Sequence, residues 1–442
     1  MSMTLVQRRA ASGKSIPLND EQVAAVIDMS AWINRHATMP LEGVHRLFCL
    51  RGYAGTGKTF TVTRLLESCP SLRASNVVFT APTNKAVKVL RQYLDDNHVT
   101  SQTCTIHSLL GLQMAANGEL KELTSSDFNK IDLSDVDLVV VDEASMVNRK
   151  LFKEIWNAVQ RFNFLVLFMG DPAQLPPVGE NSCPIWKIPQ TLTLTKIMRH
   201  TNTIVDLATE VRAVVDDPEP YVDIIPREHV FVHTRREFLE TILSRLDDLK
   251  TGRSKVIAWR NATVDKYNDF IREAIYGVEK AQAEPFIEGD KIVATEPGKD
   301  LYDNIIFKTD EEFVVQRAEI SKHPKFPEYE TYRILAKHED GRLITLFVLT
   351  ESGKFDLENK LQELASDAKN GRRELWRKFW RLKEAFHQIR SSYAITSHRS
   401  QGSTYDTVFV DRRDILANIN ASEAFRSLYV AVTRAKHEVH IY

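Results

Sequence analysis

Residues 52–59 read Gly-Tyr-Ala-Gly-Thr-Gly-Lys-Thr, which matches the phosphate-binding loop pattern G-x-x-x-x-G-K-[ST]. An apolar run, 47–50, precedes the loop, and a segment that can be helical, 60–67, follows it. The motif requires this strand–loop–helix order, because its glycines let backbone N–H groups face a phosphate chain at the N-terminus of a helix. The pattern therefore requires an α/β unit and predicts a nucleoside triphosphate site.

The composition indicates a globular protein of ordinary type. The length of 442 residues suggests about three domains, and hydrophobic residues make up 43% of the chain. A net charge of −1 disfavours a protein that coats nucleic acid by bulk charge, but it leaves a local basic track open. The four cysteines are scattered, which predicts a reduced, cytoplasmic setting without a zinc site or disulfides. Since no apolar run is long enough to cross a bilayer, we expect no membrane partner.

Three more apolar runs are each followed by a polar signature. Continuous apolar runs suit strands that are buried on both faces, as in a parallel sheet. Ligands of such sheets bind outside the carboxyl ends of the strands, where these signatures fall. The runs and their signatures are 77–79 before Thr-Ala-Pro-Thr-Asn-Lys-Ala, 139–141 before Asp-Glu-Ala-Ser, and 164–169 before Gly-Asp-Pro-Ala-Gln.

Three side chains in these signatures suit phosphate chemistry. Asp142 directly follows an apolar strand, the usual place for a carboxylate that holds Mg²⁺. Glu143 can polarise an attacking water as a general base. Gln174 can sense the γ-phosphate from the next loop. Alone, the acidic pair would be read as a solvated strand end and Gln174 as a loop amide, but the upstream phosphate loop favours the functional interpretation.

The pattern recurs in the second half of the chain. Residues 256–259, 407–410 and 439–441 are predicted strands. Between them lie the polar run Thr-Ser-His-Arg-Ser-Gln-Gly-Ser-Thr, from position 396, and the run Tyr-Val-Ala-Val-Thr-Arg-Ala, from position 429. Arg434 is near the end of a predicted helix, where a lone arginine would usually be solvated or ion-paired.

Two insertions are expected. In the first half, Asn117-Gly118 lies at the centre of a predicted β-hairpin, because this dipeptide tolerates a type I′ turn. It is either a surface hairpin without a role or a wedge, with Met114 as the candidate tip. In the second half, short strands are followed by apolar residues at helical spacing, and residues 369–383 hold seven basic residues against one acid. This arm is a core-packed helix with a solvated basic face, or, by the helicase resemblance set out next, a tower that braces the hairpin or lines the exit path of DNA.

Taken together, the ordered motifs resemble those of superfamily 1 helicases of the RecD-like, 1B branch. Their spacing is most similar to the Dda-like group of phage helicases. The resemblance implies an α/β fold with two RecA-like parallel-sheet motor domains. It further implies a β-hairpin pin inserted in the first domain and an SH3-like barrel with a helical tower inserted in the second. The expected boundaries are 1–111 with 126–190 for the first motor domain, 112–125 for the pin, 191–276 with 391–442 for the second motor domain, and 277–390 for the barrel and tower.

The resemblance also implies the nucleotide site, with ATP and Mg²⁺ as cofactors. Leu-Asn-Asp-Glu-Gln at 18–22 resembles an adenine-reading motif and gives Gln22 that role. Thr59 and Asp142 would hold the metal, and Glu143 would activate water. The phosphates would be held by the loop residues Gly52, Gly55, Thr56, Gly57 and Lys58, and the γ-phosphate would be reached by Gln174, Arg199 and Arg434. Lys58, Glu143, Gln174, Arg199 and Arg434 are the expected catalytic group.

By the same resemblance, the chain would be a monomeric, ATP-dependent 5′-to-3′ translocase and helicase. It would act on single-stranded and forked duplex DNA in replication or recombination, alongside single-strand-binding or other replication proteins. The alternative is a DNA-dependent ATPase that remodels protein–DNA complexes or needs a partner to unwind. A small-molecule kinase would share the loop but give no reason for Arg434 or the second sheet. The expected DNA contacts are Thr83, Asn84, Lys85, Thr105, His107, Thr396 and His398.

Overall fold

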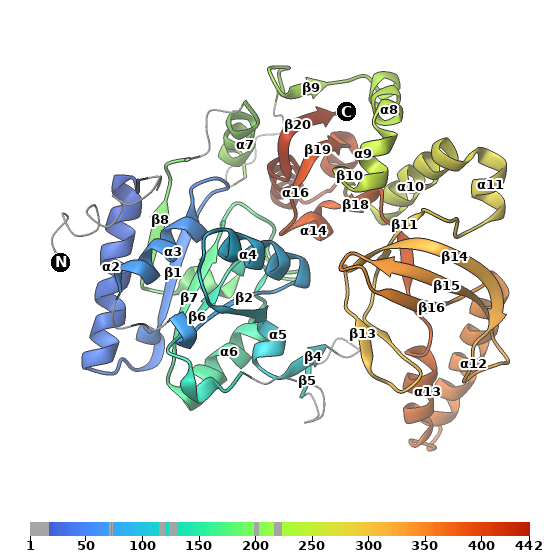
Figure 1. Cartoon of the computed structure of the whole chain (residues 1–442), viewed down its shortest axis with the longest axis horizontal. Coiled ribbons are helices and arrows are strands. Elements are labelled where there is room, and N and C mark those ends of the chain that lie inside the picture. The colour runs from blue at the N-terminus through green and yellow to red at the C-terminus, as the bar shows by residue number, and fades with distance from the viewer. Residues whose placement is uncertain are drawn as a thin grey trace.

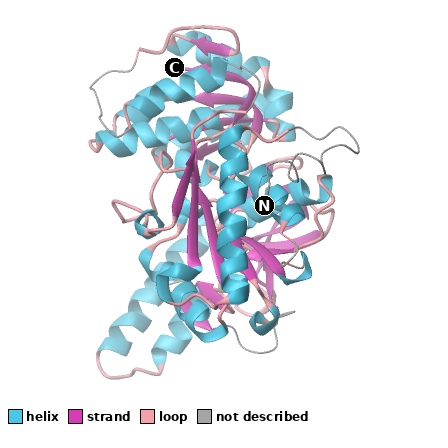
Figure 2. Ribbon diagram, turned by 90° about the vertical axis from the view of Figure 1, so that its left-hand side faces the viewer, coloured by secondary structure: helices cyan, strands magenta, loops and turns pink. Residues whose placement is uncertain are grey.

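The computed structural model describes residues 17–69, 72, 74–114, 120–122, 131–198, 203–215 and 223–442 (Figure 1). Two parallel sheets and one antiparallel sheet account for most of the strands, and the three sheets remain separate (Figure 2). The predicted α/β class with two parallel sheets is confirmed. The predicted turn Asn117-Gly118 and the predicted site residue Arg199 lie outside the described residues.

The first parallel sheet has the strand order β3-β2-β6-β7-β1-β8. Its neighbouring strands are all parallel, and its inner strands are buried along their length because their side chains are apolar on both faces. The strands are β1 (Leu47–Gly52), β2 (Val77–Ala81), β3 (Gln102–Thr105), β6 (Leu138–Val141), β7 (Leu165–Gly170) and β8 (Thr191–Leu194).

Helices cover both faces of this sheet. One apolar core holds side chains of α2 (Asp20–Thr38), α3 (Lys58–Ser68) and α4 (Asn84–Asp96) against one face. The opposite core holds side chains of α5 (Ile106–Leu109) and α6 (Arg149–Phe162). The inner strands are therefore covered on both faces, and their carboxyl ends are left for a site.

The first motor domain was expected to end at residue 190, but the next strand, β8, still belongs to its sheet. Residues 49–52 of β1 pair with residues 191–194, so β8 is the edge strand of the first sheet. A boundary at 190 would remove this strand from the sheet to which it is hydrogen-bonded. The chain leaves the first sheet after Leu194.

The hairpin insertion is present as two short antiparallel strands, β4 (Leu112–Met114) and β5 (Leu120–Glu122). Leu112 pairs with Glu122 and Met114 with Leu120. The backbone thus agrees with the predicted hairpin. The Met114 side chain, proposed as its tip, is outside the described part.

The second parallel sheet has the order β18-β10-β19-β20-β9. Its strands are β9 (Val230–Val232), β10 (Ser254–Ala258), β18 (Ala394–Thr396), β19 (Tyr405–Val410) and β20 (Ala435–Ile441). The helices of this half are α7 (Thr203–Ala213), α8 (Arg235–Ser244), α9 (Leu246–Thr251), α10 (Asn261–Tyr276), α11 (Val278–Ala283), α14 (Ser397–Ser400), α15 (Arg412–Leu416) and α16 (Ala421–Thr433). The buried helix α16 contributes Phe425, Leu428 and Tyr429 to the main core of this sheet.

The insertion in the second half is a five-stranded antiparallel sheet in the order β16-β15-β14-β11-β17, with a helical arm beside it (Figure 1). Phe313, Ile334 and Leu346 belong to the core of this barrel-like sheet. The elements are β11 (Lys291–Ala294), β12 (Gly298–Lys299), β13 (Ile305–Phe307), β14 (Glu312–Lys322), β15 (Glu330–His338), β16 (Leu343–Leu349), β17 (Ile389–Ser391), α12 (Glu351–Lys369) and α13 (Leu375–Lys383).

The two helices of the arm pack against each other around a small apolar cluster that includes Leu357, Leu364 and Leu382. The arm therefore has a packed apolar side, as the first of the two sequence-based interpretations required. None of the helices in the described ranges is both long and apolar enough to cross a membrane.

Gly353, in the first turn of α12, packs closely against the barrel strands β15 and β16. A Cβ at this position would lie 2.3 Å from the Glu330 carbonyl oxygen and 3.1 Å from Leu349 Cδ2. Because a backbone oxygen cannot move aside cheaply, we expect Gly353→Ala to lower the free energy of unfolding by roughly 1–3 kcal/mol. Chemical denaturation measures the change. Lys354→Ala, on the exposed face of the next position, is the control and should change it by less than about 0.5 kcal/mol; equal effects of the two substitutions would contradict this packing.

Candidate nucleotide site and strand-end surface

The phosphate loop joins β1 to α3, and its glycines are required by its shape. Gly55 and Gly57 have φ angles of 80° and 76°, in the left-handed region that favours glycine. A Cβ at Gly57 would lie 2.7 Å from Gln22 Nε2, and one at Gly52 would lie 2.6 Å from Thr56 Oγ1. The loop therefore keeps backbone N–H groups close to the N-terminus of α3, which is the arrangement that binds phosphate.

Lys58 and Thr59 follow the loop in the first turn of α3. The Lys58 ammonium donates to the carbonyl oxygens of Gly52, at 2.6 Å, and Tyr53, at 3.2 Å, and so lies over the loop. Thr59 Oγ1 is 3.4 Å from Asp142 Oδ2. A hydroxyl beside a half-buried carboxylate is an oxygen donor set that suits Mg²⁺, so these two residues fit the predicted metal.

The acidic pair lies at the carboxyl end of β6. Burial, and then the neighbouring Glu143 charge, raise the pKa of Asp142 to about 6. The Glu143 backbone N–H donates to Asp142 Oδ1 at 2.8 Å, and Glu143 has a φ of 49°. A non-glycine residue in the left-handed region carries strain, which is common where a side chain must be aimed at a site.

Nearly all of the predicted nucleotide residues meet at one cleft of about 480 Å³. It lies between the loop of the first sheet and the end of α16 from the second. Gly52 and Thr56 belong to the loop without lining the cleft. Those that line it are Gln22, Gly55, Gly57, Lys58, Thr59, Asp142, Glu143, Gln174 and Arg434.

Gln22 is buried, and its amide has two protein partners. Its Oε1 accepts from the Asn19 backbone N–H at 3.0 Å, and its Nε2 donates to the Thr56 carbonyl at 3.1 Å. The first bond is part of a capping box that starts α2. Since an amide oxygen accepts two hydrogen bonds and an NH₂ group donates two, one position remains at each end for a base.

Two of the three predicted γ-phosphate residues, Gln174 and Arg434, line the cleft between the two sheets. Arg434 is buried against its own half, donating to the carbonyl oxygens of Val430, at 3.1 Å, and Ser403, at 3.2 Å. Gln174 Oε1 is buried and has no hydrogen-bond partner in the described part of the chain. A buried amide oxygen without a partner is expected where a ligand or water completes the site.

The segment that leads to Arg199 also reaches the loop. The backbone N–H of Met198 donates to the Gly55 carbonyl at 2.9 Å, and Met198 lines the cleft. Just before it, the N–H groups of Thr195 and Lys196 donate to Glu21 Oε2 at 2.7 and 2.9 Å. The first residues of the connection between the two sheets, 195–198, therefore run along α2 and the phosphate loop.

Tyr429 links the two sheets at this site, and the sequence analysis assigned it no role. Its hydroxyl accepts from the Ala54 N–H of the loop at 3.0 Å and donates to Asp171 Oδ2 at 2.6 Å. One turn earlier on α16, Arg426 donates to the Gln174 carbonyl at 3.2 Å. The i, i+3 spacing of these two residues on α16 was the available sequence signal.

The three threonines predicted to contact DNA have a shared structural role. Thr83, Thr105 and Thr396 each end a strand or follow it and cap the next helix. Their hydroxyls accept from the backbone N–H groups of Ala86, Ser108 and Arg399 at 3.2, 3.1 and 3.3 Å. Asn84 is the first residue of α4. The caps place helix starts, with their unpaired N–H groups, at the strand ends of both sheets.

The two predicted histidines are next to these caps. Burial lowers the pKa of His107 and the pKa of His398, so both imidazoles are neutral at pH 7. His398 Nε2 is 3.7 Å from Glu423 Oε1. A neutral imidazole offers one N–H donor to a phosphate oxygen and no charge.

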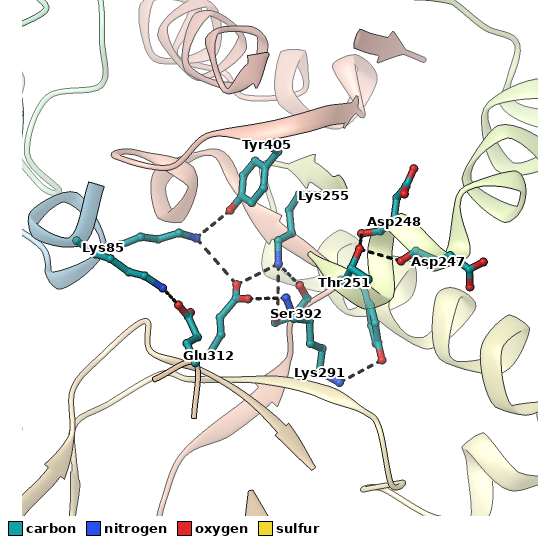
Figure 3. Close-up of polar contacts among 12 residues, drawn as sticks. Lys85, Asp247, Asp248, Thr251, Lys255, Lys291, Glu312, Ser392 and Tyr405 are labelled. Carbon is teal, nitrogen blue, oxygen red and sulfur yellow. Dashed lines mark hydrogen bonds and ion pairs between the residues drawn. The ribbon is translucent and has the colours of Figure 1, made fainter. Parts of the chain in front are cut away.

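Lys85 lies in a different environment from the one expected for a strand contact. Its ammonium donates to the Tyr405 hydroxyl at 2.9 Å and is 4.0 Å from Glu312 Oε1 (Figure 3). The same carboxylate is 3.1 Å from both the Lys255 and the Lys291 ammonium. Lys85, on α4 of the first half, thus contacts Tyr405 of the second sheet and Glu312 of the barrel, and so joins all three parts.

Glu312 is the centre of this cluster. Burial alone would raise the pKa of its carboxyl, but Lys255, Lys85 and Lys291 together hold that pKa well below its ordinary value. Burial lowers the pKa of Lys255, whose side chain is almost completely inaccessible. The buried ammonium is therefore compatible with the fold only while Glu312 stays ionised.

Comparison with known proteins places these features in a family context. Residues 35–224 match the family model of an AAA domain, and residues 391–442 match that of a UvrD-like helicase C-terminal domain. The uncharacterised protein R530 of Acanthamoeba polyphaga mimivirus is 27% identical, over 90% of this chain and 95% of that protein. The ATP-dependent DNA helicase dda of Enterobacteria phage T4 is 28% identical, over 88% of this chain and 93% of that protein.

The fold also resembles a solved structure along nearly its whole length. The Pif1 helicase from Bacteroides in complex with ADP-AlF3 and ssDNA superposes with a TM-score of 0.51 at 17% identity, covering 97% of this chain and 92% of that one. The shared fold includes both parallel sheets and identifies them as RecA-like cores.

The Glu312 cluster generates a prediction on stability. Because Glu312→Gln leaves the buried Lys255 ammonium without a counter-charge, we expect a loss of about 3 kcal/mol in the free energy of unfolding at pH 7. The folded pKa of Glu312 is depressed, so its contribution is present above the unfolded value of about 4.3 and is lost as the pH falls through the folded value. The difference between wild type and variant should thus be constant from pH 8 to pH 5 and narrow only below about pH 4.

Denaturation at several pH values measures this difference, with Glu328→Gln, on the exposed surface, as the charge-matched control. A variant as stable as the control at pH 7 would show that the cluster does not hold the junction.

Proposed function

We propose that this chain, a superfamily 1B helicase homologous to the Dda, RecD and Pif1 helicases, is an ATP-dependent 5′-to-3′ DNA translocase that unwinds duplex DNA. The observation that carries the proposal is the cleft shared by the two RecA-like sheets. It joins Lys58 and Asp142 of the first sheet to Arg434 of the second. A site divided in this way changes shape whenever the two halves move, as a motor requires.

The first half would bind ATP and Mg²⁺. Lys58 and the loop N–H groups would hold the phosphates, while Thr59 Oγ1 and the Asp142 carboxylate would hold the metal, which neutralises phosphate charge when bound. Glu143, aimed by its strained backbone, would accept a proton from the attacking water. Gln22 would use the remaining positions of its amide to read adenine.

The second half would complete the site. Arg434 would exchange its carbonyl partners Val430 and Ser403 for the γ-phosphate oxygens as the halves approach. Gln174 would reach the same phosphate from the first half, and we propose that Arg199 reaches it as well. An arginine in this role is worth roughly 10³–10⁵ in rate. Loss of the γ-phosphate would release Arg434, and the halves would separate again.

A DNA strand would lie across the helix starts at the strand ends of both sheets. Backbone N–H groups and the side chains of Thr83, Asn84, Thr105 and Thr396 suit phosphate oxygens and read no sequence. His107 and His398 would add N–H donors, and Lys85 would do so on leaving the Glu312 cluster. The β4–β5 hairpin between the motor motifs favours an enzyme that separates strands over a translocase that does not. We further propose a monomer that works in the cytoplasm and meets replication proteins on forked DNA.

The proposed unwinding activity and its direction can be tested with duplexes that have a single-stranded tail at one end. The protein is mixed with ATP, Mg²⁺ and duplexes that carry either a 5′ or a 3′ single-stranded tail, and strand separation is followed. We expect opening of the 5′-tailed duplex only, and none with Lys58→Ala, which removes the phosphate contact without changing the loop backbone. Preference for the 3′ tail would overturn the polarity, and hydrolysis without opening of either duplex would favour the non-unwinding translocase.

Arg434→Ala separates the arginine's catalytic role from a role in binding. We expect nucleotide to bind within a few-fold of wild type and the DNA-stimulated turnover at saturating ATP to fall at least 10³-fold, because charge on the γ-phosphate is then not compensated. Turnover and the Kd for ATP are measured on the same preparation, with Arg413→Ala on α15 as a matched arginine control. Weak nucleotide binding with normal turnover at saturation would contradict the assignment.

A further inference from the structure

A second large cleft lies in the insertion of the second half, between the barrel and the arm. It encloses about 1450 Å³ and is walled by the β12–β13 loop, the residues after β14, the strands β15 and β16, and the helix α13. Its lining shares no residue with the nucleotide cleft and includes none of the predicted DNA contacts. It is therefore a separate site.

The lining of this cleft carries a surplus of positive charge. Eight lysines or arginines line it against four aspartates or glutamates. Three of the basic residues are neutralised by ion pairs: Lys299 with Glu384, Arg333 with Glu319 and Arg342 with Asp340. The other five, which we call the cleft cations, form no ion pair within the described ranges; they are Lys322, Lys325, Arg377, Lys378 and Arg381.

The other ionisable groups of the lining cancel this charge only in part. Burial lowers the pKa of His323 to about 4 and also lowers the pKa of His387, so both are neutral at pH 7. Asp300 accepts hydrogen bonds from the backbone N–H groups of Tyr302 and Asn304 in its own loop. With Asp303 and Glu374 it sets three carboxylates of the lining against the five cleft cations, which leaves a surplus of two positive charges. The cleft cations are thus available to an external anion.

Aromatic rings lie among these cations. Phe326, Phe347 and Trp380 line the cleft and are only partly buried. Trp380 also has the Lys383 ammonium 5.2 Å from its ring centroid. Rings beside several unpaired cations provide faces for stacking bases and charges for the phosphates between them, and a base can stack only when it is unpaired. Inorganic phosphate or an acidic peptide would use the charges but not the ring faces.

We propose that this cleft is a second binding site for single-stranded nucleic acid, distinct from the strand path across the two RecA-like sheets. The inference rests on the proposed function, because it assumes that the chain works where single strands are exposed. The strand has two possible sources, either the strand separated from the tracked one or a continuation of the tracked strand itself. The two sources place the same phosphates and bases in the cleft.

The test compares two double variants of the full chain with the same change in charge. Lys325→Ala/Arg381→Ala removes two exposed cleft cations from different walls. Lys354→Ala/Lys360→Ala removes two lysines of α12 that do not line the cleft, of which Lys354 is exposed and Lys360 is half-buried. Binding is measured as a function of salt on three substrates: a short oligonucleotide, a long single strand and a fork with two single-stranded tails.

We expect the cleft variant to bind the fork about tenfold more weakly than the control at low salt. The slope of log K against log salt should fall by about 1.4, because each lost phosphate contact on a single strand removes about 0.7. ATP turnover stimulated by the short oligonucleotide should be unchanged. A defect confined to the fork assigns the separated strand to the cleft, and a defect shared by the long single strand assigns the tracked one.

Equal affinities and slopes for the two variants on every substrate would overturn the proposal, as would an equal loss on the short oligonucleotide. A wild-type protein whose turnover does not respond to any DNA would instead overturn the proposed function, so the two failures are distinguishable.

Discussion

The hydroxyl of Tyr429 is the contact on which the relation between the two halves depends. It accepts a hydrogen bond from the phosphate loop at Ala54 and donates one to the buried Asp171 carboxylate, while it belongs to a helix of the second sheet. Burial raises the pKa of Asp171, so this carboxylate is costly to leave without a partner. Arg426 adds a bond to the loop that carries Gln174. Through Tyr429 and Arg426 the second half therefore contacts the phosphate loop and the loop that carries Gln174, while Arg434 is still bonded to carbonyl oxygens of its own half.

A second junction, around Glu312, binds the insertion to both halves by a different principle. Here the partners are charges: one carboxylate faces three ammonium groups, of which Lys85 comes from the first half and Lys255 from the second. Buried charges of this kind add little net stability but exclude arrangements in which any one of them is unpaired. The barrel is consequently placed with respect to both sheets by electrostatics, whereas the two sheets meet through hydrogen bonds at the nucleotide site.

The sequence predicted the strand ends well, because their signals are local. A continuous apolar run followed by a polar signature specifies a buried parallel strand and its exposed end together, and Asp142, Glu143 and the glycine-rich loop were found in this way. Contacts between distant segments could not be predicted. Thr191–Leu194 was assigned to the second half because nothing local shows that it pairs with β1. Lys85 was expected to contact the DNA strand. Its ion pair with Glu312 could not be foreseen, because the two residues are more than two hundred positions apart in the sequence. Tyr429 was hidden by its apolar surroundings on α16.

The edge position of β8 has a mechanical consequence. The chain leaves the first sheet at Leu194, and within four residues its backbone is bonded to Glu21 on α2 and to Gly55 in the phosphate loop. The covalent tether between the halves is thus fastened to the loop that would grip the nucleotide. A rotation of one half would act on this tether close to the point where phosphate would bind. The backbone contacts of residues 195–198 would then couple the interdomain angle to the phosphate loop without any side chain crossing between the halves.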